Sequence, residues 1–249
     1  DDASGRAADY SRLRACRTSA AALPPTVKAA FDRLVGREVL VEGYGLTETS
    51  PLTHANPIDR PRPGSIGIPL PDTDARVVDL DTRADVAPGQ SGELLVRGPQ
   101  VMKGYWNRPG ETAAVLAGGW LHTGDVARMD AEGYFAIVDR RKDVINVAGF
   151  KVWPREVEEV LYAHEAVKLA VVVGVPDRYR GETVKAFVVL NEGRRVAAAE
   201  LMEFCRDRLS GYKVPRAVEF RTELPTSGAG KLLRRALRES SPSIQGGTP

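Results

Sequence analysis

The apolar and polar positions divide the chain into three stretches with different periodicity. In the first stretch, to about residue 63, a short strand within 13–22 is followed by a helical pattern over 24–34 and a second strand over 39–41. Pro24 and Pro25 can begin this helix because proline is tolerated in a first turn, and Gly36 lies where a glycine commonly ends one. The order strand, helix, strand predicts part of an α/β sheet.

The second stretch, over about 62–138, has short strands at close spacing with Gly, Pro and Asp between them. The strand patterns are S-I-G-I-P-L, A-R-V-V-D-L and G-E-L-L-V-R-G. A turn-rich segment over 98–110 and a helical turn over 111–116 follow, and a last apolar strand covers 135–138. This spacing predicts a small antiparallel sheet or barrel.

The third stretch, over 144–249, alternates helices with strands rich in β-branched residues. Amphipathic patterns predict helices over 154–163, 197–209 and 231–239, and apolar runs predict strands over 144–147, 167–175, 183–190 and 218–220. About a hundred residues of this kind predict a compact α+β domain with its own core.

Between the second and third stretches, residues 139–143 (D-R-R-K-D) are all charged. A charged cluster between two strands is ordinarily an exposed surface turn. The alternative is a hinge, in which a few residues absorb a large backbone rotation between two packed bodies. The pattern alone leaves both interpretations open.

Composition narrows the class of protein. The 249 residues are 43% apolar, which is enough for real cores, and the formal net charge of +2 gives no sign of nucleic-acid binding. No apolar run approaches the ~20 residues of a transmembrane helix. Cys16 and Cys205 lie far apart, which favours a reducing compartment, and we therefore expect a cytoplasmic protein. The three histidines are not at metal-ligand spacing, so we expect no zinc site.

The segment Y-G-L-T-E-T-S, over 44–50, follows a predicted strand and contains a glycine turn. Such a position is a natural place for ligand contacts in an α/β sheet. The Thr47 hydroxyl could donate to a phosphate oxygen, and the Glu48 carboxylate could help hold a Mg²⁺ ion that bridges phosphates. A polar loop with a capping threonine explains the same pattern without a ligand.

Two further positions offer weaker signals. Asp125, in G-W-L-H-T-G-D, could accept both hydroxyls of a ribose, although a lone Asp after Gly is usually a turn residue. Lys231, in L-P-T-S-G-A-G-K, could carry its ammonium to an anionic group. This segment is not a Walker loop, because Pro225 stands where glycine is required and Leu232 follows the lysine.

The order of the motifs resembles the adenylate-forming (AMP-binding) superfamily, from about residue 13 to 238. The motifs that carry the resemblance are Y-G-L-T-E-T-S-P-L, G-S-I-G-I-P-L-P, G-E-L-L-V-R-G-P-Q-V-M-K-G-Y-W, G-W-L-H-T-G-D, V-D-R-R-K-D-V-I-N-V-A-G-F-K-V and G-Y-K-V-P. They are most similar to bacterial medium- and long-chain fatty acyl-CoA synthetases. The resemblance implies an acid–thiol ligase that joins a fatty acid to coenzyme A at the expense of ATP, forming AMP, with Mg²⁺.

The resemblance also implies a domain organisation. Residues 1–138 would be the C-terminal end of the large AMP-binding domain, α/β in class, with its small β-barrel over about 62–138. Residues 139–143 would be the hinge, and 144–249 the small mobile α+β C-terminal domain. The family runs two half-reactions on one site, and this explains why an exposed charged hinge would lie between the two parts.

The same resemblance implies roles for single residues. Thr47 would contact the α-phosphate, Glu48 would help bind Mg²⁺, and Lys231 would reach the substrate carboxylate and the α-phosphate. Asp125 would bind the ribose hydroxyls, and Lys142 would be the hinge residue. The remaining nucleotide and coenzyme A contacts would be Tyr44 and Gly45 around the adenine, Ile137 near the base, Arg140 beside Asp125, Lys151 facing phosphates and Gly149 lining the pantetheine tunnel.

The chain also departs from the family pattern. No stretch resembles the Ser/Thr/Gly-rich phosphate loop that ends in Pro-Lys-Gly, and most of the acyl pocket is missing too. The adenine-side Gly-Gly-Ala reads Ser19-Ala20-Ala21 here, and Asn146 stands where some relatives carry a lysine. The chain starts without an initiator methionine, as a piece of a longer protein does. We therefore expect it to be inactive alone and to expose apolar surface, with a possible homo-oligomer.

Two other interpretations stay open. The first is another enzyme of the superfamily, an aryl-CoA ligase or a peptide-synthetase adenylation domain. The second is a non-catalytic fragment that binds a nucleotide or coenzyme A without turnover. Neither interpretation involves a nucleic-acid partner.

Overall fold

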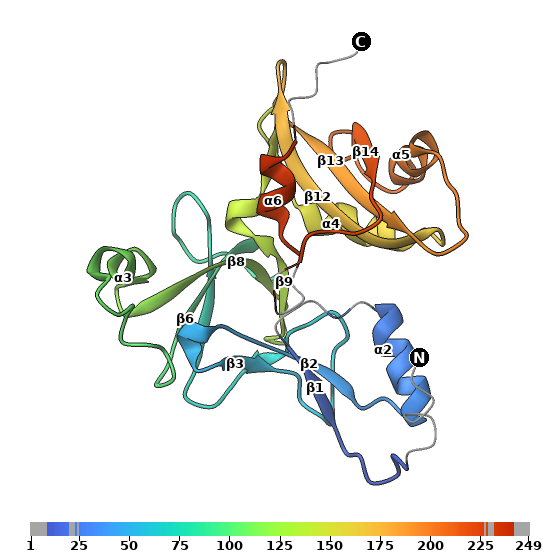
Figure 1. Cartoon of the computed structure of the whole chain (residues 1–249). Helices are drawn as coiled ribbons and strands as arrows, with labels where there is room; N and C mark the ends of the chain where they lie inside the picture. The colour runs from blue at the N-terminus through green and yellow to red at the C-terminus, as the bar shows by residue number, and fades with distance from the viewer. Residues whose placement is uncertain (1–8, 20–22, 24, 227, 229–231, 242–249) are drawn as a thin grey trace. The chain divides into compact units, whose positions relative to one another are not determined.

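The computed structural model describes residues 9–19, 23, 25–226, 228 and 232–241. The chain divides into two compact units, Asp1–Ile137 and Val138–Pro249. Figure 1 shows the elements of both. Within the described ranges, no helix is both long enough and apolar enough to cross a bilayer.

The first unit begins with a four-stranded sheet in the order β1-β2-β3-β4. Its elements are β1 (Cys16–Thr18), α2 (Pro25–Val35), β2 (Leu40–Gly45), the 3₁₀ helix η1 (Thr47–Thr49), β3 (Leu52–Ala55) and β4 (Ile68–Pro69). β1 is parallel to β2, and the β2–β3 and β3–β4 pairs are antiparallel. The predicted helix and its two flanking strands are confirmed.

β3 is an element that the sequence pattern does not predict. Its central residues, Thr53 and His54, are polar, yet both are fully buried. The His54 ring meets the rings of Tyr44 and Phe135 edge to face, at centroid distances of 5.9 and 4.8 Å. Its Nδ1 lies 2.9 Å from the Thr53 hydroxyl oxygen. Aromatic packing therefore places in the core a strand that hydropathy alone assigns to a loop.

The second sheet of this unit has the order β5-β6-β8-β7, with β9 also paired to β8. Its elements are β5 (Asp74–Val78), β6 (Ser91–Arg97), α3 (Pro109–Val115), β7 (Leu116–Ala117), β8 (Trp120–Met129) and β9 (Phe135–Arg140). The β5–β6, β6–β8 and β7–β8 pairs are antiparallel, as the short strand patterns predict. Leu94, Val96 and Phe135 are at the centre of its core.

Apolar side chains are also exposed on this unit. Val27 and Leu34 lie seven residues apart, and therefore on one side of α2, with exposed fractions of 51% and 45%. Ile58 is exposed as well. Single exposed apolar side chains are ordinary on a protein surface, so the expected apolar surface and the oligomeric state both stay predictions.

The second unit contains a five-stranded sheet, β11-β10-β13-β12, with β14 also paired to β13. Its elements are η2 (Arg141–Asp143), β10 (Ile145–Val147), β11 (Phe150–Val152), α4 (Pro154–Tyr162), β12 (Val167–Asp177), β13 (Gly181–Leu190), α5 (Ala198–Arg206), β14 (Ala217–Phe220) and α6 (Arg234–Glu239). β12 and β13 form a long antiparallel hairpin, and β14 runs parallel to β13.

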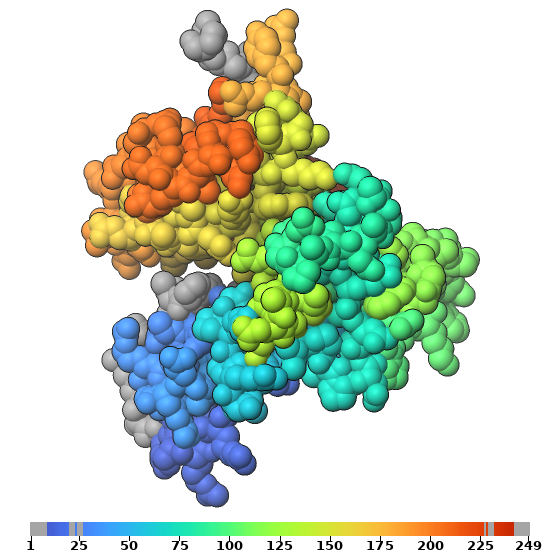
Figure 2. Space-filling view, turned by 180° about the vertical axis from the view of Figure 1, so that it is seen from behind, coloured from blue at the N-terminus to red at the C-terminus, as the bar shows by residue number. Residues whose placement is uncertain are grey.

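Both faces of this sheet are covered, which explains the near-continuous apolar run of β12. Ala170 and Val172 face one core, with α4 and α5, whereas Val171 and Val173 face the other, where Leu237 of α6 packs. Figure 1 shows α6 against β12, and Figure 2 shows the orange segment with α5 against the yellow segment with α4. Successive strand residues point to opposite faces, so a strand buried on both sides needs apolar residues at every position.

The structure corrects two expectations in this unit. β9 continues to Arg140, and Asp139 is buried with an exposed fraction of 4%, so the predicted cluster is not exposed along its whole length. The pattern also does not predict β11, which pairs with β10 through a two-residue turn at Ala148 and Gly149. Both turn residues have positive φ, 52° and 89°, the geometry that two-residue hairpin turns favour.

We predict that Gly45→Ala destabilises the first unit. A Cβ at Gly45 would lie 1.7 Å from the Pro51 carbonyl oxygen and 2.8 Å from the Leu52 Cα, so β2 and β3 would have to separate. The expected loss is about 1–3 kcal/mol or more, measured by urea unfolding. Gly110→Ala is the matched control, because a Cβ there meets nothing within 4 Å. Equal stability of the two variants would contradict the prediction.

We also predict that acid destabilises the first unit through His54. Burial lowers the pKa of His54 to about 3, whereas an unfolded histidine has a pKa of about 6.5. Between these values the unfolded chain binds one more proton, so stability is lost as pH falls below about 6.5, by about 1.4 kcal/mol per pH unit. From pH 7 to about pH 5 the loss from this group is about 2 kcal/mol.

Urea unfolding at the two pH values measures this slope. His54→Gln should flatten it, and His122→Gln, in the same unit, serves as the control substitution. An unchanged slope in His54→Gln would show that the buried imidazole is not its source.

Candidate functional site

The site residues predicted from the sequence divide between the two units. The first unit contains Tyr44, Gly45, Thr47, Glu48, Asp125 and Ile137, and the second contains Arg140, Lys142, Gly149 and Lys151. Lys231 and two of the adenine-side residues, Ala20 and Ala21, lie outside the described residues. Asp125 and Arg140 lie in different units, so the expected proximity of these two residues stays a prediction.

Tyr44 and Asp125, 81 positions apart in the sequence, meet in the first unit. The Tyr44 hydroxyl donates to Oδ2 of Asp125 at 2.6 Å. Asp125 is buried, and its N–H donates to Oγ1 of Thr123 at 3.1 Å. The Thr123 hydroxyl in turn donates to the Leu94 carbonyl at 2.7 Å. β2 and β8 belong to different sheets, so the fold brings together two candidates that the sequence can only name separately.

The loop between β2 and β3 is held by Thr49. Its Oγ1 accepts the Leu46 N–H at 2.9 Å and lies 3.0 Å from the carbonyl oxygens of both Leu46 and Pro51. Thr49 is fully buried, whereas the preceding Thr47 is exposed. The sequence also allowed a polar loop in which a threonine is a capping residue and contacts no ligand. Thr49 is the threonine that fills this structural role. Thr47 projects from a loop that another residue keeps in shape.

Glu48 is partly buried and has a partner that sequence reasoning missed. Its Oε1 accepts the Tyr105 hydroxyl at 2.8 Å, and its backbone carbonyl accepts the Met102 N–H at 2.8 Å. The hydrogen bond to Glu48 raises the pKa of Tyr105. The only sequence signal for Tyr105 is its place in the motif G-Y-W, which suggests no partner. Two bonds from the 98–110 segment thus fix both the backbone and the carboxylate of Glu48.

The remaining candidates are simpler to place. Ile137 packs, half-buried, against the core of the second sheet of the first unit. Lys142 is exposed within η2, and Arg140, directly after buried Asp139, is exposed too. Gly149 and Lys151 are exposed on the β10–β11 hairpin, where the Gly149 N–H donates to Oδ1 of Asn146 at 3.0 Å.

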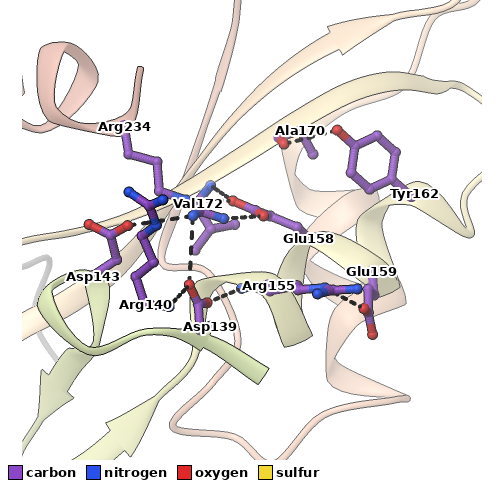
Figure 3. Close-up of polar contacts among 10 residues, drawn as sticks. All are labelled: Asp139, Arg140, Asp143, Arg155, Glu158, Glu159, Tyr162, Ala170, Val172 and Arg234. Atoms are coloured by element: carbon purple, nitrogen blue, oxygen red, sulfur yellow. Dashed lines mark hydrogen bonds and ion pairs between the residues drawn. The ribbon is translucent and has the colours of Figure 1, made fainter. Parts of the chain in front are cut away.

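The second unit also holds a partly buried charge cluster that the sequence analysis missed: two of its members, Asp139 and Glu158, are buried. We define the charge cluster as Asp139, Asp143, Glu158 and Arg234 (Figure 3). Burial raises the pKa values of Asp139 and Glu158, and Arg234 offsets part of this increase. The available signal was Glu158, a carboxylate on the side of α4 that carries Val157 and Leu161, where only a paired charge is tolerated.

Family models match both units. Residues 2–106 match the AMP-binding enzyme model, and residues 156–231 match the model of the AMP-binding enzyme C-terminal domain. The chain is 56% identical over 232 residues to a long-chain-fatty-acid–CoA ligase of Bacillus subtilis (strain 168), which covers 93% of this chain. It is 44% identical over 238 residues, 94% of this chain, to a feruloyl-CoA synthase of Amycolatopsis sp.

Solved structures agree with these matches. ATP-bound MatB from Rhodopseudomonas palustris superposes with a TM-score of 0.87 at 34% identity, over 91% of this chain and 45% of that one. The chain spans 41% of the length of the Bacillus ligase and 47% of the feruloyl-CoA synthase. Fold, motifs and relatives together show that the chain belongs to the AMP-binding, or adenylate-forming, enzyme family.

Proposed function

We propose that the chain is part of an AMP-forming fatty acyl-CoA ligase for long-chain acids. The observation that carries the proposal is its identity to the Bacillus ligase, which extends over nearly the whole chain. In the proposed reaction, a carboxylate oxygen of the fatty acid attacks the α-phosphorus of ATP and pyrophosphate leaves. The sulfur of coenzyme A then attacks the acyl carbon, and AMP leaves.

In this proposal the first unit binds the nucleotide. Tyr44 and Gly45 line the adenine, with Ile137 near the base, and Asp125 accepts the ribose hydroxyls. The bond from Tyr44 to Asp125 supports this role, because it holds the carboxylate in one orientation. An ionised carboxylate has about four acceptor positions, so it can accept the tyrosine hydroxyl and ligand hydroxyls together.

Thr47 and Glu48 would face the phosphates. Within the described ranges there is no cluster of three or more His, Cys, Asp or Glu residues that could hold a metal ion by itself. One carboxylate fits Mg²⁺ nonetheless, because this ion is usually bound through one or two carboxylates plus substrate phosphates. When bound, it would neutralise phosphate charge. The Tyr105 hydroxyl would then orient the Glu48 carboxylate.

The second unit would supply the remaining groups. Lys231 would stabilise negative charge on the carboxylate and α-phosphate, and Arg140 and Lys151 would face the nucleotide and phosphates. Gly149 would line the pantetheine path after a rotation about Lys142. The exposure of Lys142, Gly149 and Lys151 supports roles that need access to ligands. A cytoplasmic location belongs to the same proposal, supported by two free thiols, Cys16 and Cys205.

A second candidate function is an aryl-CoA ligase, which the similarity to a feruloyl-CoA synthase favours. A hybrid enzyme tests whether this chain supports ligase chemistry: the chain would replace the matching part of the Bacillus ligase, which would keep its own acyl pocket. We expect long-chain-fatty-acid-dependent release of pyrophosphate and formation of acyl-CoA. A hybrid that folds but releases no pyrophosphate would contradict the proposal, and turnover that shifts to ferulate would favour the second candidate.

The chain alone provides a further test. We expect it to release no pyrophosphate with ATP, Mg²⁺ and fatty acids, because its sequence contains no phosphate loop to preorganise donors around the triphosphate. Fatty-acid-dependent release would show that another segment replaces that loop.

Asp125→Asn should weaken AMP binding by about tenfold, or about 1.4 kcal/mol, because it removes a charged acceptor for hydroxyls. Titration calorimetry with AMP and 2′,3′-dideoxy-AMP measures the effect. The unchanged chain should prefer AMP, and the variant should bind the two nucleotides nearly equally. Asp74→Asn is the control, since Asp74 is an exposed partner of Arg97. A variant that keeps the preference for AMP would remove Asp125 from the ribose site.

A further inference from the structure

Arg234 lies at the centre of the charge cluster and contacts carboxylates from three segments (Figure 3). Its Nη2 lies 2.5 Å from Oε2 of Glu158, and its Nε donates to Oε1 of Glu158 at 3.2 Å. Its Nη1 lies 3.6 Å from Oδ1 of Asp139 and 3.6 Å from Oδ2 of Asp143. The planar guanidinium can serve several carboxylates at once, which a lysine ammonium does less well.

Asp139 is held by the backbone as well. Its Oδ2 accepts the N–H of Arg155 at 2.8 Å, and its Oδ1 accepts the N–H of Arg140 at 2.7 Å. Arg155 is the second residue of α4, and the first N–H groups of a helix have no partner within the helix. Asp139 therefore caps α4 from outside and places a negative charge at its positive end.

These contacts restrain the segment that contains the proposed hinge residue. Asp139 precedes Arg140, Arg141 and Lys142, and Asp143 follows them, so Arg234 contacts carboxylates on both sides of three exposed cationic residues. A backbone rotation at Lys142 would carry Asp139 away from Asp143. Such a rotation therefore requires that Asp139 leave both Arg234 and the N–H of Arg155.

The same geometry leaves Arg234 with a partner after this release. Glu158 is bound closely by two nitrogens of Arg234, whereas Asp139 lies 3.6 Å away, so Arg234 stays paired when Asp139 leaves. Three carboxylates around one guanidinium also repel one another, and the departure of one relieves that repulsion.

We propose that Arg234 is a positioning residue that latches the 139–143 segment, and that release of Asp139 from Arg234 permits rotation at Lys142. Arg234 follows Lys231 by three positions in the sequence, so the latch and the proposed active-site lysine share one short segment. The inference deepens the proposed function, since it concerns the rotation between the two half-reactions. Its test does not use turnover, and its failure is therefore distinguishable from a failure of the ligase proposal.

Limited proteolysis by trypsin reports on the latch, because the enzyme cleaves after Arg140, Arg141 and Lys142. Cleavage should be slow in the unchanged chain and about tenfold faster in Asp139→Asn, which keeps the size of the side chain but loses its charge. The matched control is Glu219→Gln, which breaks the Lys185–Glu219 ion pair of the same unit without touching the charge cluster. Mass spectrometry would compare these sites with the other tryptic sites.

A second variant separates a latch from general stabilisation. Arg234→Lys keeps the charge but loses the planar fork, and it should accelerate cleavage at the same three positions. Combined with Asp139→Asn it should add little, because both substitutions remove one contact. Hydrogen exchange should also show faster exchange at the Arg155 amide in Asp139→Asn. Unchanged cleavage, additive effects, or a uniform increase at all tryptic sites would each overturn the proposal.

Discussion

The partly buried guanidinium of Arg234 is the interaction on which the second unit most depends. A charge removed from water is costly unless it is paired and hydrogen-bonded, and breaking a buried pair is costlier than never forming it. Here one cation satisfies Glu158 of α4 and contacts Asp139 at the end of β9. α4, α6 and the entry of the chain into the unit are therefore positioned together, and a change in one alters the solvation of the others.

The first unit is stabilised differently, by the close approach of two backbone segments and by hydrogen bonds that involve side-chain hydroxyl groups. Gly45 lets β2 and β3 come together where a Cβ would collide, and Thr49 holds the loop between them. Two candidate ligand groups are then held by hydrogen bonds, Asp125 of β8 by Tyr44 and Glu48 of η1 by Tyr105, and these bonds restrict carboxylates that would otherwise rotate. Preorganised donors and acceptors of this kind need little reorganisation when a charged ligand binds.

The two units together give a consistent picture of the proposed ligase. The first unit contains the side chains suited to bind a nucleotide. The second contains exposed candidate residues and the restrained 139–143 segment. Two half-reactions with different leaving groups favour a site that is assembled twice rather than one fixed arrangement. The restraint on the 139–143 segment suggests how the two arrangements would differ: the Asp139 carboxylate would contact Arg234 in one and not in the other.

Periodicity and motif order predicted the strand β12, the helices α2 and α4, and the family to which the chain belongs. These features are predictable because they depend on local sequence. The strands β3 and β11 were not predicted from the sequence. Hydropathy does not reveal β3, because its core residues are polar, and it does not reveal the two-residue turn before β11, because one turn residue is not glycine. Tertiary structure alone decided that Asp139 is buried, that Tyr44 meets Asp125, and that Glu48 has Tyr105 as its partner. These facts depend on which distant segments meet, and the chain carries no local signal for a contact made 81 or 57 positions away.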